Sequence, residues 1–342
     1  MPNPTIPEIY FPPPFVKSVI TDAQYRTWLT RKAKYIIAED RSRKRACVKT
    51  ATERMYKQLI HKAVTEAGQF DPFTGETLHW ELVCMWNDAN TKNLDEPVFR
   101  KYALLPTVDH VDPYGSSIDF EICSWHINRS KNNLTPQEFV ALCKRIAGRG
   151  NAQLSGSVRK KVNGPTLRLA TVYGSPQKYF LPDFLKGIVP EAQYRRWLLR
   201  KASHLYHADK KQNRPCVANA TGSQYKALIH QAVVNNGPLD PFTGQTLRWR
   251  LLGAWDDSFT KNPGKALVKK FSLLPTIDHI DPCENAPAFE ICSWLVNRCK
   301  ADLTPEEFVA QCRRIVEFRN RTRSGQESAL DKTYAKRRRH CR

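Results

Sequence analysis

Residues 101–113 read KYALLPTVDHVDP and residues 120–131 read FEICSWHINRSK, and both stretches return 169 positions later. Their second versions are KFSLLPTIDHIDP at 270–282 and FEICSWLVNRCK at 289–300. Around them, positions 11–150 align with positions 180–319 without a net gap, although other parts of the two copies have diverged. A unit of this length can bury a core of its own, so we expect two tandem domains rather than a solenoid of short repeats.

The repeat also predicts where the domains begin and end. We expect the first domain at 9–148 and the second at 179–319. Residues 149–178 are rich in glycine, serine and lysine and have no counterpart in the other copy, which predicts a basic flexible linker. Residues 320–342 are predicted to form a basic C-terminal tail.

Within each copy the pattern alternates between helical and extended segments. Thr21 is the expected N-cap of the first helix, and Thr135-Pro-Gln-Glu138 is a capping box that returns at 304–307. This mixture predicts the α+β fold class. For the first copy we expect helices at 22–38, at 53–67, from near Ser124 and again from Thr135, and strands at 78–84, 104–111 and 120–123.

The net charge of +21 points to a polyanionic partner. We predict DNA and leave RNA open, and we expect no membrane association because no apolar run approaches the length of a span. The N-terminus does not have the pattern of a secretory signal. The ten cysteines fit buried free thiols in a reducing compartment. We therefore expect an intracellular, cytoplasmic protein, with a nuclear or nucleoid-associated location left open.

Three polar residue types recur together in both copies. Asp109 and His110 lie near the end of a predicted strand, and Asn128 follows 18 residues after the histidine. Carboxylate and carboxamide oxygens are hard ligands that suit Mg²⁺ or Mn²⁺. Because neighbouring side chains on a strand point to opposite faces, the histidine is free to act as a general base on water. The second copy carries the same set as Asp278, His279 and Asn297.

This set resembles the core of the HNH endonucleases of the His-Me finger (ββα-metal) superfamily. In that family an Asp-His-Ile-x-Pro strand precedes a helix that bears His or Asn, with Lys three residues on. Residues 109–113 match the first element, and Asn128-Arg-Ser-Lys131 matches the second. The resemblance covers 71–131 and 240–300, with the helices N-terminal to these ranges added to the core. It implies two tandem His-Me finger domains.

The resemblance implies a role for each matched side chain. Asp109 and Asn128 would bind Mg²⁺ or Mn²⁺, and His110 would take a proton from the attacking water. Arg129 or Lys131 would contact a phosphate oxygen. The counterparts in the second copy are Asp278, His279, Asn297, Arg298 and Lys300.

The chain also departs from the family pattern. Asp119 stands where the family has an asparagine that orients the histidine, and Ala288 stands there in the second copy. The zinc-binding cysteine pairs of many members are replaced by Asp71 with Thr74 and by Ser124 with Ile127. We therefore expect no structural zinc, and expect apolar packing in its place from Trp80, Trp86 and Trp125.

Two functions remain open from the sequence. In the first, the chain is a metal-dependent endonuclease whose two HNH-like sites act as a pseudo-dimer, each cutting one strand of DNA. In the second, it is a DNA- or RNA-binding protein built from nuclease domains that no longer cleave. Basic residues retained on the first helix are candidate phosphate contacts, or part of a solvated helix face; they are Arg31, Lys32, Arg200 and Lys201.

Overall fold

The structure is a computed structural model of the whole chain. It describes residues 9–45, 48, 51–86, 100–115, 117–149, 179–218, 220–254, 264–281 and 284–339, with side chains as far as Thr322. Almost all of the predicted linker lies outside the described residues, as do Cys47 and Pro282.

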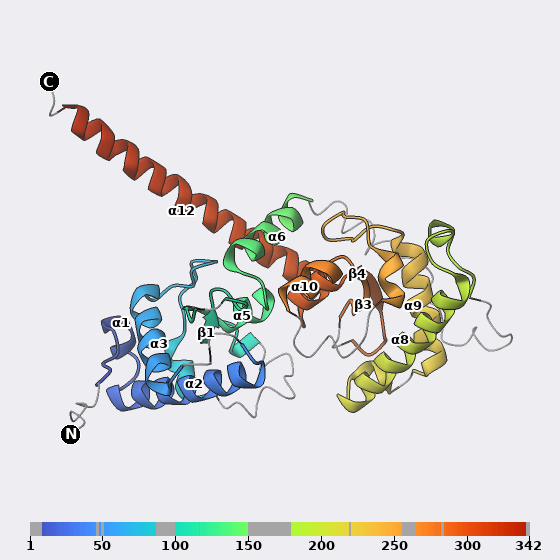
Figure 1. The fold of residues 1–342 in the computed structure, drawn as a ribbon, viewed down its shortest axis with the longest axis horizontal. Helices are drawn as coiled ribbons and strands as arrows, with labels where there is room; N and C mark the ends of the chain where they lie inside the picture. Colours follow the sequence, from blue (N-terminus) through green and yellow to red (C-terminus); the bar gives the residue numbers. More distant parts are fainter. Residues whose placement is uncertain are drawn as a thin grey trace. The chain divides into compact units, whose positions relative to one another are not determined.

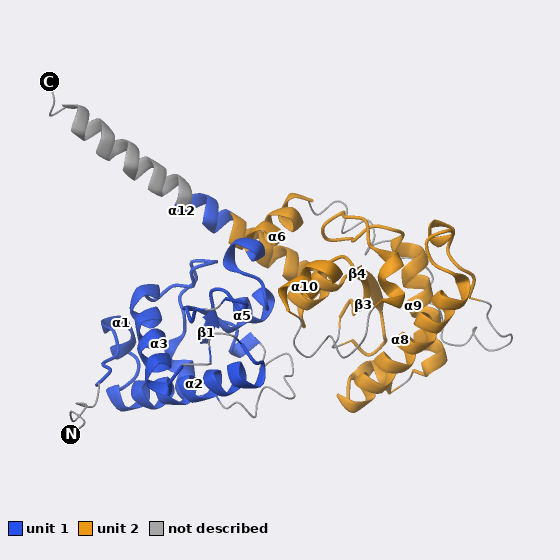
Figure 2. Ribbon diagram, viewed as in Figure 1, with its two compact units in different colours: residues 1–139, 317–342 blue, residues 140–316 orange. Residues whose placement is uncertain are grey.

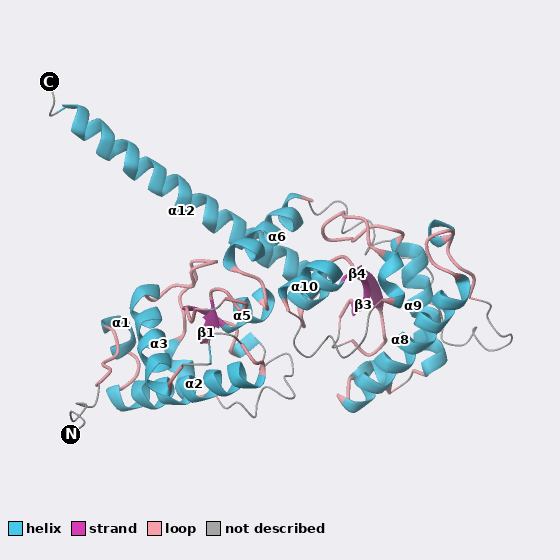
Figure 3. Ribbon diagram, in the orientation of Figure 1, coloured by secondary structure: helices cyan, strands magenta, loops and turns pink. Residues whose placement is uncertain are grey.

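Each copy combines helices with one small sheet, so the α+β class is confirmed (Figure 1, Figure 3). The first copy contains α1 (Pro14–Lys17), α2 (Asp22–Ser42), α3 (Glu53–Ala67), η2 (Trp80–Cys84), β1 (Pro106–His110), β2 (Phe120–Ser124), α5 (Trp125–Lys131) and α6 (Pro136–Gly148). The second contains η5 (Asp183–Leu185), α8 (Glu191–Lys211), η6 (Pro215–Val217), α9 (Gly222–Asn236), η7 (Trp249–Gly253), α10 (Lys265–Phe271), β3 (Pro275–His279), β4 (Phe289–Ser293), α11 (Trp294–Lys300) and α12 (Pro305–Arg339).

The two sheets are antiparallel pairs with the same register. In β1 and β2, Asp109 lies opposite Glu121 and His110 lies opposite Phe120. In β3 and β4, the corresponding pairs are displaced by the same 169 residues. The helix α3 packs against both α2 and β2, and β2 is the partner of the strand that carries the Asp-His pair. The sheet positions the site, and these helices cover it.

Capping explains where the first long helix begins. The Thr21 side chain accepts a hydrogen bond from Gln24 N, and the Gln24 side chain accepts one from Thr21 N, so the predicted N-cap is confirmed. The matching helix α8 begins after Pro190, whose side chain makes no capping bond. The strand expected at 78–84 is wrong, because residues 80–84 form a 3₁₀ helix. Leu82 and Val83 are both buried, which is incompatible with the alternation of a half-buried strand.

A carboxylate joins the two places where the family carries zinc ligands. Asp71 Oδ1 accepts hydrogen bonds from Phe73 N and Thr74 N within the turn. Its other oxygen, Oδ2, accepts one from Ser124 N at 2.6 Å. Asp240 makes the same three bonds in the second copy. The completely buried aspartate therefore ties the turn to the strand end through backbone N–H groups. The predicted tryptophans Trp80, Trp86 and Trp125 lie in the first core.

The chain divides into two compact units, residues 1–139 with 317–342 and residues 140–316 (Figure 2). Each unit thus contains the C-terminal helical segment of the other copy. In the first unit, the Arg319 guanidinium lies 5.2 Å from the Phe73 ring centre. In the second, Arg145 donates a hydrogen bond to Gln245 at 3.3 Å. The backbone of the predicted tail is helical as far as Arg339.

The structure also bears on the expected state of the cysteines and on the expected lack of a membrane span. Among the described cysteines, Cys84 is exposed, and the following are buried free thiols: Cys123, Cys143, Cys216, Cys292, Cys299 and Cys312. Over the part of the chain that was searched, every helix is too short or too polar to cross a bilayer.

Candidate functional site

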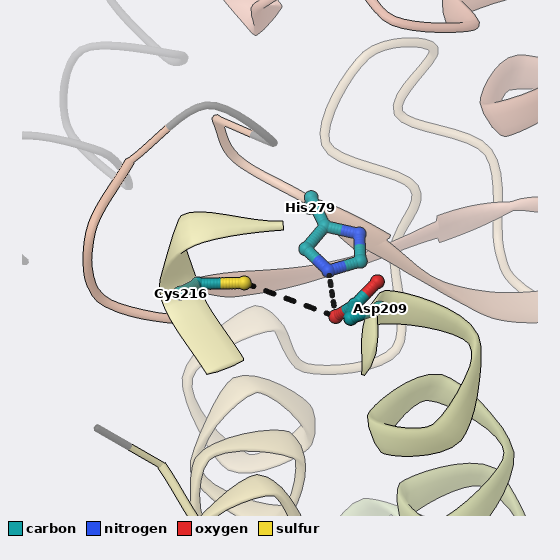
Figure 4. A group of neighbouring side chains, drawn as sticks. All are labelled: Asp209, Cys216 and His279. Atoms are coloured by element: carbon teal, nitrogen blue, oxygen red, sulfur yellow. Dashed lines mark hydrogen bonds and ion pairs between the residues drawn. The ribbon is translucent and has the colours of Figure 1, made fainter. Parts of the chain in front are cut away.

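The imidazole of His110 is hydrogen-bonded to a carboxylate that lies 70 residues earlier in the chain. His110 ends β1, and its Nε2 is 2.9 Å from Oδ2 of Asp40, near the end of α2. Asp40 is almost completely buried, whereas 13% of the His110 side chain is exposed. In the second copy, His279 Nε2 lies 2.8 Å from Asp209 Oδ2, and Figure 4 shows the ring facing that carboxylate. Each copy therefore contains an Asp-His dyad.

Two further side chains hold the carboxylate of the first dyad. Tyr56 donates a hydrogen bond to Asp40 Oδ2 at 2.6 Å, and Arg45 Nη1 lies 3.3 Å from Oδ1. Burial alone would raise the pKa of the Asp40 carboxyl. The bonds from His110 and Tyr56 and the charge of Arg45 outweigh it and hold that pKa below its ordinary value. Asp40 is therefore an anion at neutral pH.

An anionic partner fixes the tautomer of the imidazole. Because Asp40 can only accept, His110 Nε2 carries the proton and Nδ1 has the lone pair. No described residue hydrogen-bonds to His110 Nδ1, so this nitrogen is available as a base. In the second copy Arg214 Nη1 lies 3.0 Å from His279 Nδ1 and 3.4 Å from Nε2 of the same ring. A donor so placed does not lie along the in-plane lone pair of Nδ1, but it brings a positive charge against the His279 ring.

The neighbouring aspartate belongs to a separate, buried ionic cluster. Asp109 Oδ2 lies 3.0 Å from Lys131 Nζ, and Glu121 Oε1 lies 3.5 Å from the same nitrogen. Lys131 is completely buried and also donates to the main-chain oxygens of His110 and Leu134. Burial raises the pKa of Asp109 and raises that of Glu121 to about 7, with Lys131 opposing the rise in both. In the second copy, Lys300 pairs with Asp278 at 3.2 Å.

The motif asparagines bind the strand backbone. Asn128 Nδ2 donates to Thr107 Oγ1 at 3.2 Å and to the Val108 carbonyl at 3.3 Å. Asn297 Nδ2 donates to the Ile277 carbonyl at 3.0 Å. These bonds fasten the short helices α5 and α11 to the strands that carry the histidines. The carboxamide thus has a structural use in both copies.

The predicted divalent cation does not fit the donor set as it is arranged here. Its carboxylate ligand, Asp109, is already neutralised by the ammonium of Lys131, which has three further acceptors and no exposure. A second cation at the same oxygen would be repelled by that ammonium. The same holds for Asp278 beside Lys300. Binding of Mg²⁺ or Mn²⁺ by Asp109 with Asn128, or by Asp278 with Asn297, is a prediction that these ion pairs do not support.

A second set of candidate ligand atoms surrounds the dyad of the second copy. One atom each from Asp209, Cys216 and His279 lie within 4.8 Å of one another (Figure 4). The guanidinium of Arg214 is 3.2 Å from Asp209 Oδ1 and 3.0 Å from His279 Nδ1. Because this guanidinium supplies the positive charge that the aspartate requires, we interpret the group as a hydrogen-bond network. Cys47, the counterpart of Cys216, lies outside the described residues.

Several predicted contacts have other positions in the structure. Asp119, the expected orienting residue, is exposed, and Asp40 holds the imidazole instead. Lys131 and Lys300 are buried, so they cannot lie against a phosphate as predicted. Arg31 is not a free phosphate contact either, because its guanidinium donates to the carbonyls of Val83 and Trp86.

The remaining predicted nucleic-acid contacts are accessible to different degrees. Arg129 and Arg298 are half-buried, and their guanidinium groups lie over the rings of Trp125 and Trp294 at 4.8 and 4.7 Å. Arg200 is exposed on α8. Lys32 and Lys201 are partly buried.

Sequence reasoning missed the partners of the dyad. Asp40, Arg45 and Tyr56 lie far from the motif, in and after a basic stretch that has no recognisable periodicity. The sequence does contain one indication of their role. The same residue types occur 169 positions later, as Asp209, Arg214 and Tyr225. Comparison of the chain with protein-family models, with curated proteins and with solved structures finds no significant match.

Proposed function

We propose that the chain is a nucleic-acid hydrolase that cleaves phosphodiester bonds, with His110 as its general base. The pairing of His110 Nε2 with the buried Asp40 carboxylate carries this proposal. Such a carboxylate keeps Nδ1 unprotonated and stabilises the imidazolium that forms when Nδ1 accepts a proton. The net charge of +21 favours nucleic acid among the phosphodiesters.

In the proposed reaction, His110 Nδ1 takes a proton from water as the water oxygen forms a bond to phosphorus. The bond between phosphorus and the leaving oxygen breaks, and the leaving oxygen is protonated from solvent. Asp40 stays ionised throughout and balances the charge on the ring. Arg45 lies 3.3 Å from Asp40 Oδ1 and helps to keep that carboxylate ionised beside the ring.

The decisive experiment incubates supercoiled plasmid with the full chain in Mg²⁺, in Mn²⁺ and in EDTA. We expect His110→Ala to lower the cleavage rate by about 10²- to 10⁴-fold, the usual contribution of a general base. Asp40→Asn should lower it comparably because an amide can present its N–H₂ group and favour the wrong tautomer. His79→Ala is the matched control, since 48% of that side chain is exposed.

Substitution of the histidine in each copy shows in this assay whether both copies cleave. If both cut, His110→Ala and His279→Ala each convert a double-strand cutter into a nicking enzyme. The guanidinium of Arg214 lies 3.0 Å from His279 Nδ1, where the attacking water would have to bind, and it therefore predicts that His279→Ala changes the rate less than His110→Ala. An intact plasmid under every metal condition would contradict the hydrolase proposal.

The second copy favours a second candidate function, binding without cleavage. Its histidine pairs with Asp209 through Nε2, and the Arg214 guanidinium lies against the same ring. Gel-shift binding that persists in EDTA, together with an uncut plasmid in Mg²⁺ and Mn²⁺, would select this function for the whole chain.

A further inference from the structure

The second unit contains a cavity beside its motif asparagine. It lies between α8, the start of β3 and α11, and its volume is about 320 Å³. This volume is at the lower end of the range for small-molecule sites. Asn297 and Thr276 contribute polar groups to its wall.

The charge of the cavity lining selects for an anion. Arg200, Lys201 and Arg298 line it together with His204. Lys201 and Arg298 also have partners of their own, so Arg200 is the cation on which the proposed anion contact depends. Arg200 is exposed, so its positive charge reaches solvent at the rim. A concave surface lined by one sign of charge concentrates ligands of the opposite sign.

The deeper wall of the cavity is apolar and aromatic. Trp197, Leu252 and Trp294 line it, and each is more than nine-tenths buried. The planar guanidinium of Arg298 lies over the Trp294 ring at 4.7 Å. Nucleobases stack on aromatic rings and on guanidinium planes. The lining therefore suits a ligand that combines a flat ring with a phosphate.

The geometry also distinguishes an unpaired base from a paired one. The aromatic wall is recessed, since only a few per cent of Trp197 and Trp294 is exposed. A base inside a duplex is stacked on both faces, and it has to leave the helix to enter a recessed pocket. A base in a single strand or at a flap has no such requirement.

The first copy differs at the arginine that corresponds to Arg200 at the rim of the cavity. Arg31, the counterpart of Arg200, donates to the carbonyls of Val83 and Trp86. Its guanidinium is therefore directed to its own backbone, whereas Arg200 is exposed at the cavity rim. The candidate site is therefore the cavity of the second copy.

We propose that this cavity binds one unpaired nucleotide of a nucleic-acid strand, with its base against the aromatic wall and its phosphate at the basic rim. The inference rests on the proposed nucleic-acid function and names the form of the substrate. The second copy then holds a single-stranded segment while the first copy carries the available base.

The test measures binding of the full chain, in EDTA and at one fixed salt concentration, to a labelled 12-nucleotide oligothymidylate. A strand of equal length with abasic central units has the same phosphates and no bases to stack. We expect the intact strand to bind about tenfold tighter than the abasic strand, as base stacking predicts. The double variant Arg200→Glu with Lys201→Glu should lose this preference. Arg196→Glu, exposed on the same helix and outside the cavity, should weaken both strands alike.

Each outcome decides one point. Equal affinity for the intact and abasic strands, or a preference that survives in the double variant, would overturn the proposal. Free thymidine monophosphate that competes as well as the strand would assign the cavity to free nucleotides and overturn the assignment to a strand. A base preference in a chain that leaves plasmid uncut contradicts only the hydrolase, and cleavage without a base preference contradicts only the cavity assignment.

Discussion

Carboxylates only a few ångströms from the same strand end behave in opposite ways because their partners differ. Asp40 receives hydrogen bonds from a tyrosine and an imidazole, and its pKa is lowered in spite of burial. Glu121 has one ion pair at 3.5 Å, and burial raises its pKa to about 7. The first residue is suited to remain an anion in a catalytic dyad, and the second takes up a proton near neutral pH.

Glu121 should make the stability of the first unit depend on pH. Its pKa is 4.5 in the unfolded chain and about 7 when folded, so the folded state binds more protons between these values. The free energy of unfolding therefore falls as pH rises from 4.5 through 7. We expect Glu121→Gln to be more stable than the parent at pH 8 by on the order of 1–3 kcal/mol, with a smaller difference at pH 5.

Urea unfolding in EDTA at the two pH values measures this difference. Glu66→Gln is the control, because 66% of that side chain is exposed. A variant that gains as much stability at pH 5 as at pH 8 would contradict the assigned cause.

At the scale of elements, hydrogen bonds from polar side chains hold the turn, strand and helix of each copy together. Asp71 ties the turn to Ser124, and Asn128 ties α5 to β1. The turn itself ends at Gly75, whose φ of +73° is in the left-handed region. A Cβ added there would collide with the ring of Phe318. The turn therefore requires glycine for its backbone and for the close approach of α12.

A double-mutant cycle separates these two requirements. We expect Gly75→Ala to destabilise the first unit by about 1–3 kcal/mol, and Phe318→Ala to relieve part of that cost. Gly68 also has a positive φ, +71°, but nothing lies within 4 Å of its added Cβ. Gly68→Ala should therefore be unaffected by Phe318→Ala. Equal rescue of both glycine variants, measured by urea unfolding, would show that the collision is not the cause.

At the scale of the whole molecule, each compact unit depends on a segment from the other copy. The first unit includes residues 317–342, where Phe318 closes on Gly75 and Arg319 lies over Phe73. The second includes residues 140–149 of the first copy, with Arg145 bonded to Gln245. We therefore expect the fusion of the two copies to stabilise both units.

Truncation tests this dependence. A chain that ends at Val316 should lose protection from amide exchange in the turn at 71–75 and in the adjoining α3, by about tenfold or more in exchange rate. A chain that ends at Thr322 keeps Phe318 and Arg319 and should retain that protection. Similar exchange in the two truncated chains would mean that residues 317–322 do not stabilise the first unit.

Much of the local structure follows directly from the sequence. The Thr21 capping box, the strand ends at His110 and His279 and the restart of the helix after Thr135 depend on residues only a few positions apart. Local hydrogen bonds and periodic burial determine such features, so pattern reasoning reaches them. The error at 80–84 arose because a short apolar run has no period that separates a strand from a 3₁₀ turn.

The partners of the motif residues were decided only by tertiary structure. The sequence placed Asp109 beside His110, but α2 and α3 bring Asp40 and Tyr56 to the imidazole, and the fold buries Lys131 against Asp109. Long-range pairing depends on which helix covers which strand, and on the burial that makes an ion pair preferable to a solvated charge. These are properties of the packed chain, and no spacing within one segment encodes them.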